Sequence, residues 1–188
     1  MSEIQRKQIG DIQAILGVDM DGVWGPKSQA ALDALVRPAN GILIGSEKWD
    51  FLKARIDGDD IVIDPGIVTA FGGAHDTMDS GDTASGISTK DNPSFIGCAL
   101  PMNRDTIALR GSPIPKLPWK TAVIFTDPKT NVSVATKLID EGPAGWTKHI
   151  GDMTEAAAKL FDPHADANNF EKRLTIRIVG GAHYVKAG

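Results

Sequence analysis

The chain has 188 residues, which is enough for one ordinary domain or for a medium domain with a small companion. Its hydrophobic content of 41% and charged content of 23% are close to globular averages and argue against long disorder. A formal net charge of −4 provides no basic surface field, so nucleic-acid binding is disfavoured. The single cysteine, Cys98, excludes an internal disulfide and is expected in the core.

The first part of the chain predicts short helices. Ile9, Ile12, Ile15 and Leu16 share one helical face, and Gly17 is expected to end that helix. An Asp-Gly turn follows, and Pro26 is expected at the first position of a second helix with an apolar stripe at Ala31, Leu32, Leu35 and Val36. A third helix is expected from Ser46, as N-cap, to about Ile56.

The second part of the chain predicts strands. Short β-branched runs alternate with Gly, Pro and Asp turns: GIVTAFGG, TIALRG, TAVIFTD, VSVATKLID and LTIRIVGG. One helix, Met153–Phe161, is embedded among them with apolar residues at helical spacing. The pattern therefore predicts an α+β protein with a helical module over residues 1–40, a linker with a short helix over 41–65, and a small β-barrel over 66–188.

The N-terminal residues MSEIQRKQIGDIQAIL lack the basic start and continuous apolar run of a signal peptide, and no segment approaches membrane-spanning length. The sequence thus predicts a protein made in the cytoplasm, without a signal peptide and without an integral membrane segment.

The stretch IQAILGVDMDGVWGPKSQAALDAL, within residues 4–37, resembles the peptidoglycan-binding helical module found beside many bacterial cell-wall enzymes. The turn from Asp21 to Pro26 carries that resemblance, which implies substrate-binding roles for Asp21 and Trp24. Trp24 offers a flat face to a sugar or peptide; the alternative is that it only closes the helical core.

Three further stretches resemble the double-psi β-barrel of rare lipoprotein A-like lytic transglycosylases, with expansins and family-45 endoglucanases as distant relatives. They are TASG at Thr83–Gly86, LIDEGPA at Leu138–Ala144 and GDMTEAAAKLF at Gly151–Phe161, in the order of that superfamily. The resemblance implies a six-stranded double-psi barrel with one embedded helix, substrate-binding roles for Thr83 and Ser85, and no metal or cofactor. Where many members have a catalytic glutamate after TASG, this chain has Ile87.

Asp140 is the main catalytic candidate. By the two-residue strand period it shares a face with Val134 and Leu138, unless a bulge intervenes, and it occupies the catalytic position of the resembled family. Burial without a cation raises the pKa of a carboxyl group, as a general acid near neutral pH requires. The alternative is a turn-forming aspartate that accepts backbone hydrogen bonds.

Asp152 and Asp82 are the other carboxylate candidates. DMTE reads as a capping box, with Asp152 as N-cap and Glu155 bonding back to it, although related enzymes place a functional aspartate at this helix start. Asp82 is a possible second carboxylate for a muramidase. A lytic transglycosylase needs only one carboxylate, because the 6-hydroxyl of muramic acid attacks its own anomeric carbon, whereas hydrolysis normally needs two.

Three other side chains are candidates for substrate binding. Trp146 is expected to be exposed and able to stack on a sugar, His149 lies in the same loop, and His75 lies in the segment GGAHDTMDSGD. The sequence therefore predicts a monomeric enzyme that cleaves peptidoglycan glycan strands, reaching the wall after release or delivery, as an endolysin or effector does. The alternatives are a non-catalytic, expansin-like wall-binding protein and a two-carboxylate muramidase.

Overall fold

The computed structural model describes residues 2–15, 17–29, 31, 40–76 and 80–185. The chain divides into two compact units, residues 1–38 and residues 39–185. Among the helices in these described ranges, none is both long and apolar enough to cross a membrane.

The first unit contains helix α1 (Glu3–Ile15) and a tight turn. The helix ends as predicted, because Gly17 is in the left-handed conformation (φ 69°) and its N–H bonds to the carbonyl of Ala14 at 3.2 Å. Pro26 opens a further helical segment over residues 26–29, also as predicted. The rest of that predicted helix, with Leu32, Leu35 and Val36, lies outside the described residues.

Gln13, not an isoleucine, is the buried side chain of α1 within the described part of this unit. It is 1% exposed, whereas Ile12 and Ile15 are 43% and 76% exposed. Its amide nitrogen donates to Asp21 Oδ1 at 2.8 Å, to the Val23 carbonyl and to Ser28 Oγ. Its amide oxygen accepts from the N–H of Gly22 at 3.0 Å. One buried amide therefore holds both ends of the Asp-Gly turn.

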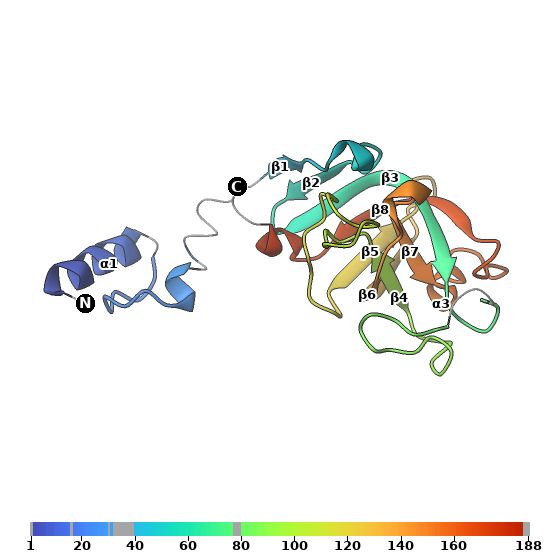
Figure 1. Ribbon diagram of the computed structural model, residues 1–188, viewed down its shortest axis with the longest axis horizontal. Helices are drawn as coiled ribbons and strands as arrows, with labels where there is room; N and C mark the ends of the chain where they lie inside the picture. Colours follow the sequence, from blue (N-terminus) through green and yellow to red (C-terminus); the bar gives the residue numbers. More distant parts are fainter. Residues whose placement is uncertain (1, 16, 30, 32–39, 77–79, 186–188) are drawn as a thin grey trace. The chain divides into compact units, whose positions relative to one another are not determined.

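The second unit is built on one eight-stranded sheet (Figure 1). The strands are β1 (Asn40–Leu43), β2 (Ala54–Asp57), β3 (Asp60–Phe71), β4 (Gly97–Leu100), β5 (Ala122–Thr126), β6 (Ser133–Glu141), β7 (Gly151–Thr154) and β8 (Glu171–Ile178). Four short helical segments join them: η1 (Glu47–Trp49), η2 (Gly145–Thr147), α3 (Glu155–Ala158) and η3 (Gly181–Tyr184).

Six of the strands close into a barrel. The order β3-β7-β4-β6-β5-β8 returns to β3, because β3 pairs in parallel with β7 and antiparallel with β8. Strands β1 and β2 extend the sheet beyond β3 through antiparallel pairs. Closure leaves no free edge within the barrel, and the predicted α+β barrel class is confirmed.

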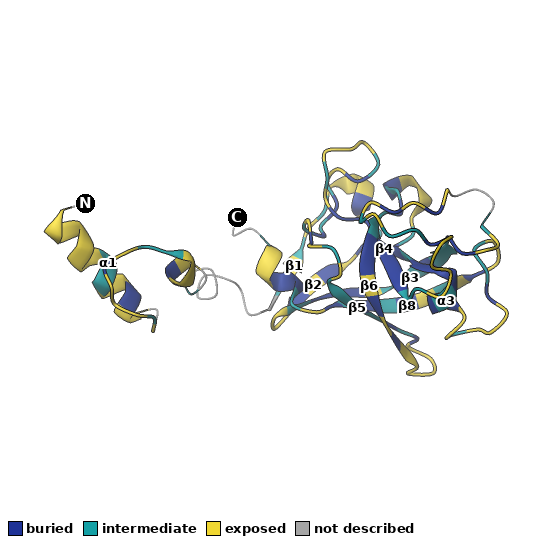
Figure 2. Cartoon of the chain, turned by 90° about the horizontal axis from the view of Figure 1, so that it is seen from below, coloured by how far each residue is buried: buried dark blue, intermediate teal, exposed yellow. Residues whose placement is uncertain are grey.

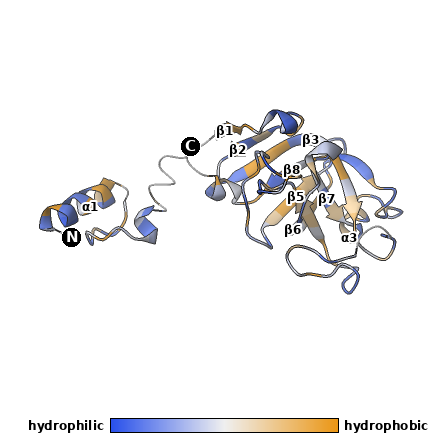
Figure 3. Ribbon diagram, in the orientation of Figure 1, coloured by the Kyte–Doolittle hydropathy of each residue, from blue (hydrophilic) through white to orange (hydrophobic). Residues whose placement is uncertain are grey.

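The barrel core is formed by fully buried residues of the paired strands. Val68, Cys98, Leu138 and Met153 are all 0% exposed. The strands appear mainly dark blue and teal in Figure 2 and carry much of the hydrophobic colour in Figure 3, whereas α1 is largely hydrophilic. Cys98 is thus a core residue, as predicted, and burial raises the pKa of its thiol to about 12.

Four predicted strands are confirmed: GIVTAFGG lies in β3, TAVIFTD in β5, VSVATKLID in β6 and LTIRIVGG in β8. The predicted strand TIALRG is wrong. The carbonyl of Thr106 accepts from the N–H groups of both Leu109 and Arg110, so that segment forms a turn.

The predicted helix from Ser46 to Ile56 is also wrong. Only η1 is helical there, Ser46 makes no side-chain cap bond, and β2 follows with alternating burial. Trp49, Leu52 and Ile56 are nevertheless buried, at 1%, 2% and 3% exposure. Residues 41–65, which the sequence assigns to a linker, contribute β1, β2 and the start of β3 to the sheet.

Candidate active site

Thr69, Asp152, Ala99 and Asp140 form one row across four neighbouring strands, called the aspartate row below. Thr69 on β3 is in register with Asp152 on β7, Asp152 is in register with Ala99 on β4, and Ala99 is in register with Asp140 on β6. Residues in direct register project from the same face of a sheet. The two aspartates therefore lie on either side of Ala99 on one face.

A β-bulge puts Asp140 on this face, and the expected alignment with Leu138 is wrong. Leu138 pairs with Cys98, but Asp140 pairs with the next residue, Ala99, so Ile139 is the extra residue of the bulge. Leu138 faces the core at 0% exposure, while Asp140 faces the other way and is half-exposed. Bulges re-aim side chains in this manner and are frequent beside active sites.

Two backbone N–H groups hold Asp140. Its Oδ1 accepts from the N–H of Ala84 at 3.0 Å and from that of Glu141 at 2.8 Å. These two bonds confirm the contacts expected under the alternative prediction, in which Asp140 accepts hydrogen bonds from the backbone. Such donors stabilise a carboxylate.

The segment Thr83–Gly86 brings one of these donors to Asp140. Ser85 N–H bonds to the Ile139 carbonyl at 3.0 Å, directly at the bulge. Thr83 is 8% exposed and its hydroxyl donates to the Ile87 carbonyl at 2.8 Å, with Ser85 Oγ 3.0 Å away. Thr83 and Ser85 thus fold the loop onto β6 and place Ala84 beside the carboxylate.

Asp152 is a strand residue, and the predicted N-cap role is wrong. It lies in β7, which continues to Thr154 in register with Phe71. Thr154 is the N-cap of α3, and its side chain accepts from the N–H of Ala157 at 3.4 Å. The predicted helix from Met153 accordingly begins two residues later, at Glu155.

Asp152 has an environment quite unlike that of Asp140. Burial raises the pKa of Asp152 above its usual value, and the charge of Asp140 raises it further. The Thr69 hydroxyl, which donates to Asp152 Oδ1, and the charge of His149 act in the opposite direction without cancelling the effect. His149 Nδ1 lies 3.3 Å from the same Thr69 hydroxyl. Asp152, Thr69 and His149 therefore form one hydrogen-bonded group.

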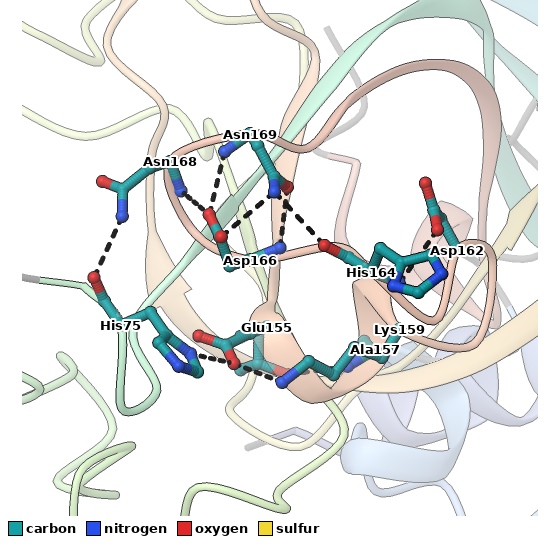
Figure 4. Close-up of polar contacts among 10 residues, drawn as sticks. His75, Glu155, Ala157, Lys159, Asp162, His164, Asp166, Asn168 and Asn169 are labelled. Carbon is teal, nitrogen blue, oxygen red and sulfur yellow. Dashed lines mark hydrogen bonds and ion pairs between the residues drawn. The ribbon is translucent and has the colours of Figure 1, made fainter.

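Asp82 and His75 make their described contacts elsewhere. Asp82 is exposed in an isolated bridge with Ser88. His75 Nδ1 lies 2.8 Å from Glu155 Oε1, whose carboxylate also contacts Lys159 (Figure 4). Burial opposes ionisation of Glu155, yet Lys159 and His75 outweigh it and lower the pKa of this carboxyl.

The tryptophans of the barrel unit differ in their surroundings. Trp146 is 67% exposed, as predicted. Trp119 is half-buried against the core beside Arg104, which pairs with Glu141 at 2.7 Å.

In the first unit, Trp24 is half-buried and its indole N–H donates to Gln29 at 3.0 Å. Asp21 has a lowered pKa, chiefly because Gln13 donates to it.

Sequence reasoning missed Thr69 and Gln13, and it expected Glu155 to bond back to Asp152, whereas its carboxylate contacts His75 and Lys159. Thr69 lies in a predicted strand, but its partner Asp152 is 83 residues away, so no local pattern signals the contact. A signal was available for Asp152, because GDMT is a short strand-like run as well as a capping box. Among the described residues, no cluster of three or more His, Cys, Asp or Glu side chains is placed to hold a metal ion.

Comparison of the chain with protein-family models finds no match, and comparison with curated proteins finds no significant one.

Proposed function

We propose that this protein cleaves the glycan strands of peptidoglycan, with Asp152 and Asp140 as its catalytic carboxylates. The observation that carries the proposal is their arrangement on either side of Ala99 in unlike environments. Pairs of titratable groups whose surroundings separate their pKa values are typical of general acid–base sites.

Asp152 is the general acid in this proposal. Its raised pKa favours the protonated form, which a general acid needs in order to donate to the leaving glycosidic oxygen. Asp140, held by two N–H donors, is the ionised partner that accepts a proton from the attacking hydroxyl. This reverses the role expected for Asp140 from the sequence.

The two aspartates are separated by one strand, and adjacent strands are about 4.8 Å apart. Hydrolysis normally uses two carboxylates, one as acid and one as base or nucleophile. The presence of both on one face supports a muramidase as the second candidate beside a lytic transglycosylase.

The proposal includes the finer assignments that the sequence motifs support. The closed barrel is of the double-psi type, and TASG, DEGP and GDMTEAAA carry its superfamily's pattern. The helical unit binds the wall through the Trp24 turn, and the protein acts there after release or delivery from the cytoplasm.

Digestion of purified peptidoglycan sacculi tests the function. The wild type is expected to release soluble fragments, whose masses separate anhydromuropeptides (transglycosylase) from reducing-end muropeptides (muramidase). Asp140→Asn and Asp152→Asn should each lower the rate about 10²–10⁴-fold, the usual value of general acid–base help. Asp82→Asn is the matched control and should retain the wild-type rate.

Two results would contradict the proposal. Folded wild-type protein that binds sacculi but releases nothing would support the expansin-like alternative, which the presence of Ile87 in place of the usual glutamate favours. Full activity in a folded Asp152→Asn protein would remove Asp152 from the mechanism.

A further inference from the structure

An exposed tryptophan and a lysine lie against each other on the barrel unit. Trp146 lies in η2, between β6 and β7, and is 67% exposed. The Lys48 ammonium, from η1, lies 5.7 Å from the centroid of its ring. Residues almost a hundred positions apart thus form one surface feature.

Buried neighbours fix the backbone next to both side chains. Trp49, next to Lys48, is 1% exposed, and its indole N–H donates to the Arg110 carbonyl at 3.0 Å. Gly145, next to Trp146, packs so closely that an added Cβ would lie 3.0 Å from Lys48 Cε and 3.1 Å from the Trp49 ring. The Lys48 ammonium also donates to the Ile107 carbonyl. A site whose side chains are held before binding loses less conformational entropy when a ligand arrives.

The chemistry of the pair favours an anionic, ring-shaped ligand. A lysine ammonium has three donors and no acceptor, and the indole N–H is a donor only. Within the described part of the chain, no carboxylate forms an ion pair with Lys48. An exposed aromatic ring stacks on apolar ring surface, and Ile107, whose carbonyl accepts from Lys48, is itself 80% exposed.

The feature is within reach of the aspartate row. Trp146 is six residues after Asp140 and six before Asp152 in the chain. A segment of six residues spans at most about 21 Å, so Trp146 is no farther than that from either aspartate backbone.

We propose that Trp146 and Lys48 form a subsite for a carboxylate-bearing sugar, in which the indole stacks on the ring and the ammonium pairs with the acid. In peptidoglycan the corresponding ligand is a muramic acid unit with its lactyl or peptide carboxylate. This identification of the ligand rests on the proposed function, whereas the preference for an acidic over a neutral saccharide does not.

Calorimetric titration of the full-length Asp140→Asn protein tests the subsite without turnover. The probes are a disaccharide of N-acetylglucosamine and N-acetylmuramic acid with a free carboxylate, and neutral chitobiose. We expect tighter binding of the acidic probe. Adding Lys48→Gln should weaken it about three- to fivefold, as an exposed ion pair would, and leave chitobiose unchanged. Adding Trp146→Ala should weaken both probes about five- to tenfold.

Lys148→Gln is the matched control, since Lys148 is an exposed lysine two residues from Trp146 and should not affect either probe. Equal affinity for both probes, or equal loss of both on Lys48→Gln, would overturn the subsite, because a merely structural role of Lys48 would lower both together. Acid-selective binding together with a wild-type protein that fails to digest sacculi would uphold the subsite and refute only the proposed function.

Discussion

The two aspartates of the row show how the position of one residue in a sheet decides its chemistry. Both project from the same face and are partly buried, yet Asp140 accepts two backbone N–H groups at a bulge, whereas Asp152 accepts from a hydroxyl and burial raises its pKa. The bulge is the cause, because in a regular strand Asp140 would share the core-facing side of Leu138, two residues before it. The bulge thus turns the carboxylate away from the core.

The raised pKa of Asp152 makes a prediction about stability. The folded protein binds this proton more tightly than the unfolded chain, so stability falls as pH rises from the unfolded value of 3.8 through the folded pKa, and the loss persists at higher pH. Asp152→Asn carries no charge and can still accept from Thr69. We therefore expect the variant to exceed the wild type in free energy of unfolding at pH 7, with the difference shrinking towards pH 3.

Urea unfolding at several pH values measures this difference, and exposed Asp82→Asn should show no comparable trend. A variant less stable than the wild type at pH 7 would contradict the raised pKa.

Thr69 makes a prediction about the pH profile of activity. Its hydroxyl lowers the pKa of Asp152, in opposition to burial. Thr69→Val removes the donor while keeping the side-chain shape, so the pKa of Asp152 should rise further. The alkaline limb of the pH–rate profile on sacculi should then move to higher pH, because the acid keeps its proton longer.

Thr69→Ser retains the hydroxyl and should keep the wild-type profile. An alkaline limb that moves to lower pH in Thr69→Val would show that Thr69 does not act on the acid in this way.

At the scale of elements, polar contacts between loops and short helices fix the surroundings of the barrel strands. Glu155, the first residue of α3, is 4% exposed and accepts from Lys159, the C-cap of that helix, and from His75 in the loop after β3. Figure 4 shows His75 and Lys159 approaching its carboxylate from either side. Asn168 continues the contact by donating to the His75 carbonyl at 3.0 Å. The cluster therefore ties the loop after β3 to α3 and to the loop before β8.

The cluster predicts acid sensitivity. The pKa of Glu155 is lowered from 4.5, so its stabilisation is fully present above that value and is lost as pH falls through the folded pKa. Glu155→Gln should lower the free energy of unfolding at pH 7 and match the wild type more closely in strong acid. Glu171→Gln, at an exposed strand position, is the control. A constant difference across pH would contradict an ionised Glu155.

The elements that the sequence predicts correctly differ from those that it predicts wrongly in how far apart in the chain their deciding contacts lie. Runs such as those in β3, β5, β6 and β8 have alternating or continuous apolar patterns, which report burial locally. Trp49, Leu52 and Ile56 fit a helical spacing and so predict a helix, but Ile56 lies in β2, where pairing with β3 decides its conformation. The strand pattern and the motif identify Asp140 as a candidate site residue. The face of the sheet from which its side chain projects depends on a bulge against β4 that no local pattern reveals.

At the scale of the whole molecule, the extent of the barrel unit follows from where its core begins. Trp49, Leu52 and Ile56 are buried before β3 starts, so the unit needs residues from about 39 onward. Fully burying a large apolar side chain stabilises a fold by about 1.5–3 kcal/mol relative to its exposure. The free energy lost by removing several of these side chains together approaches the total stability of an ordinary domain, about 5–15 kcal/mol.

This predicts different outcomes for two N-terminal truncations. A protein that starts at residue 39 should fold, retain cleavage of soluble glycan and lose affinity for sacculi, because residues 1–38 form the separate unit proposed to bind the wall. A protein that starts at Asp60 should fail to fold, because it lacks β1, β2 and Trp49. Far-UV circular dichroism with urea unfolding, and centrifugal pull-down with sacculi, measure the two effects. Equal pull-down by the full-length protein and by the form starting at residue 39 would show that the barrel unit alone binds the wall.

In the full-length protein, Trp24→Ala should reduce pull-down with sacculi without changing the rate on soluble glycan.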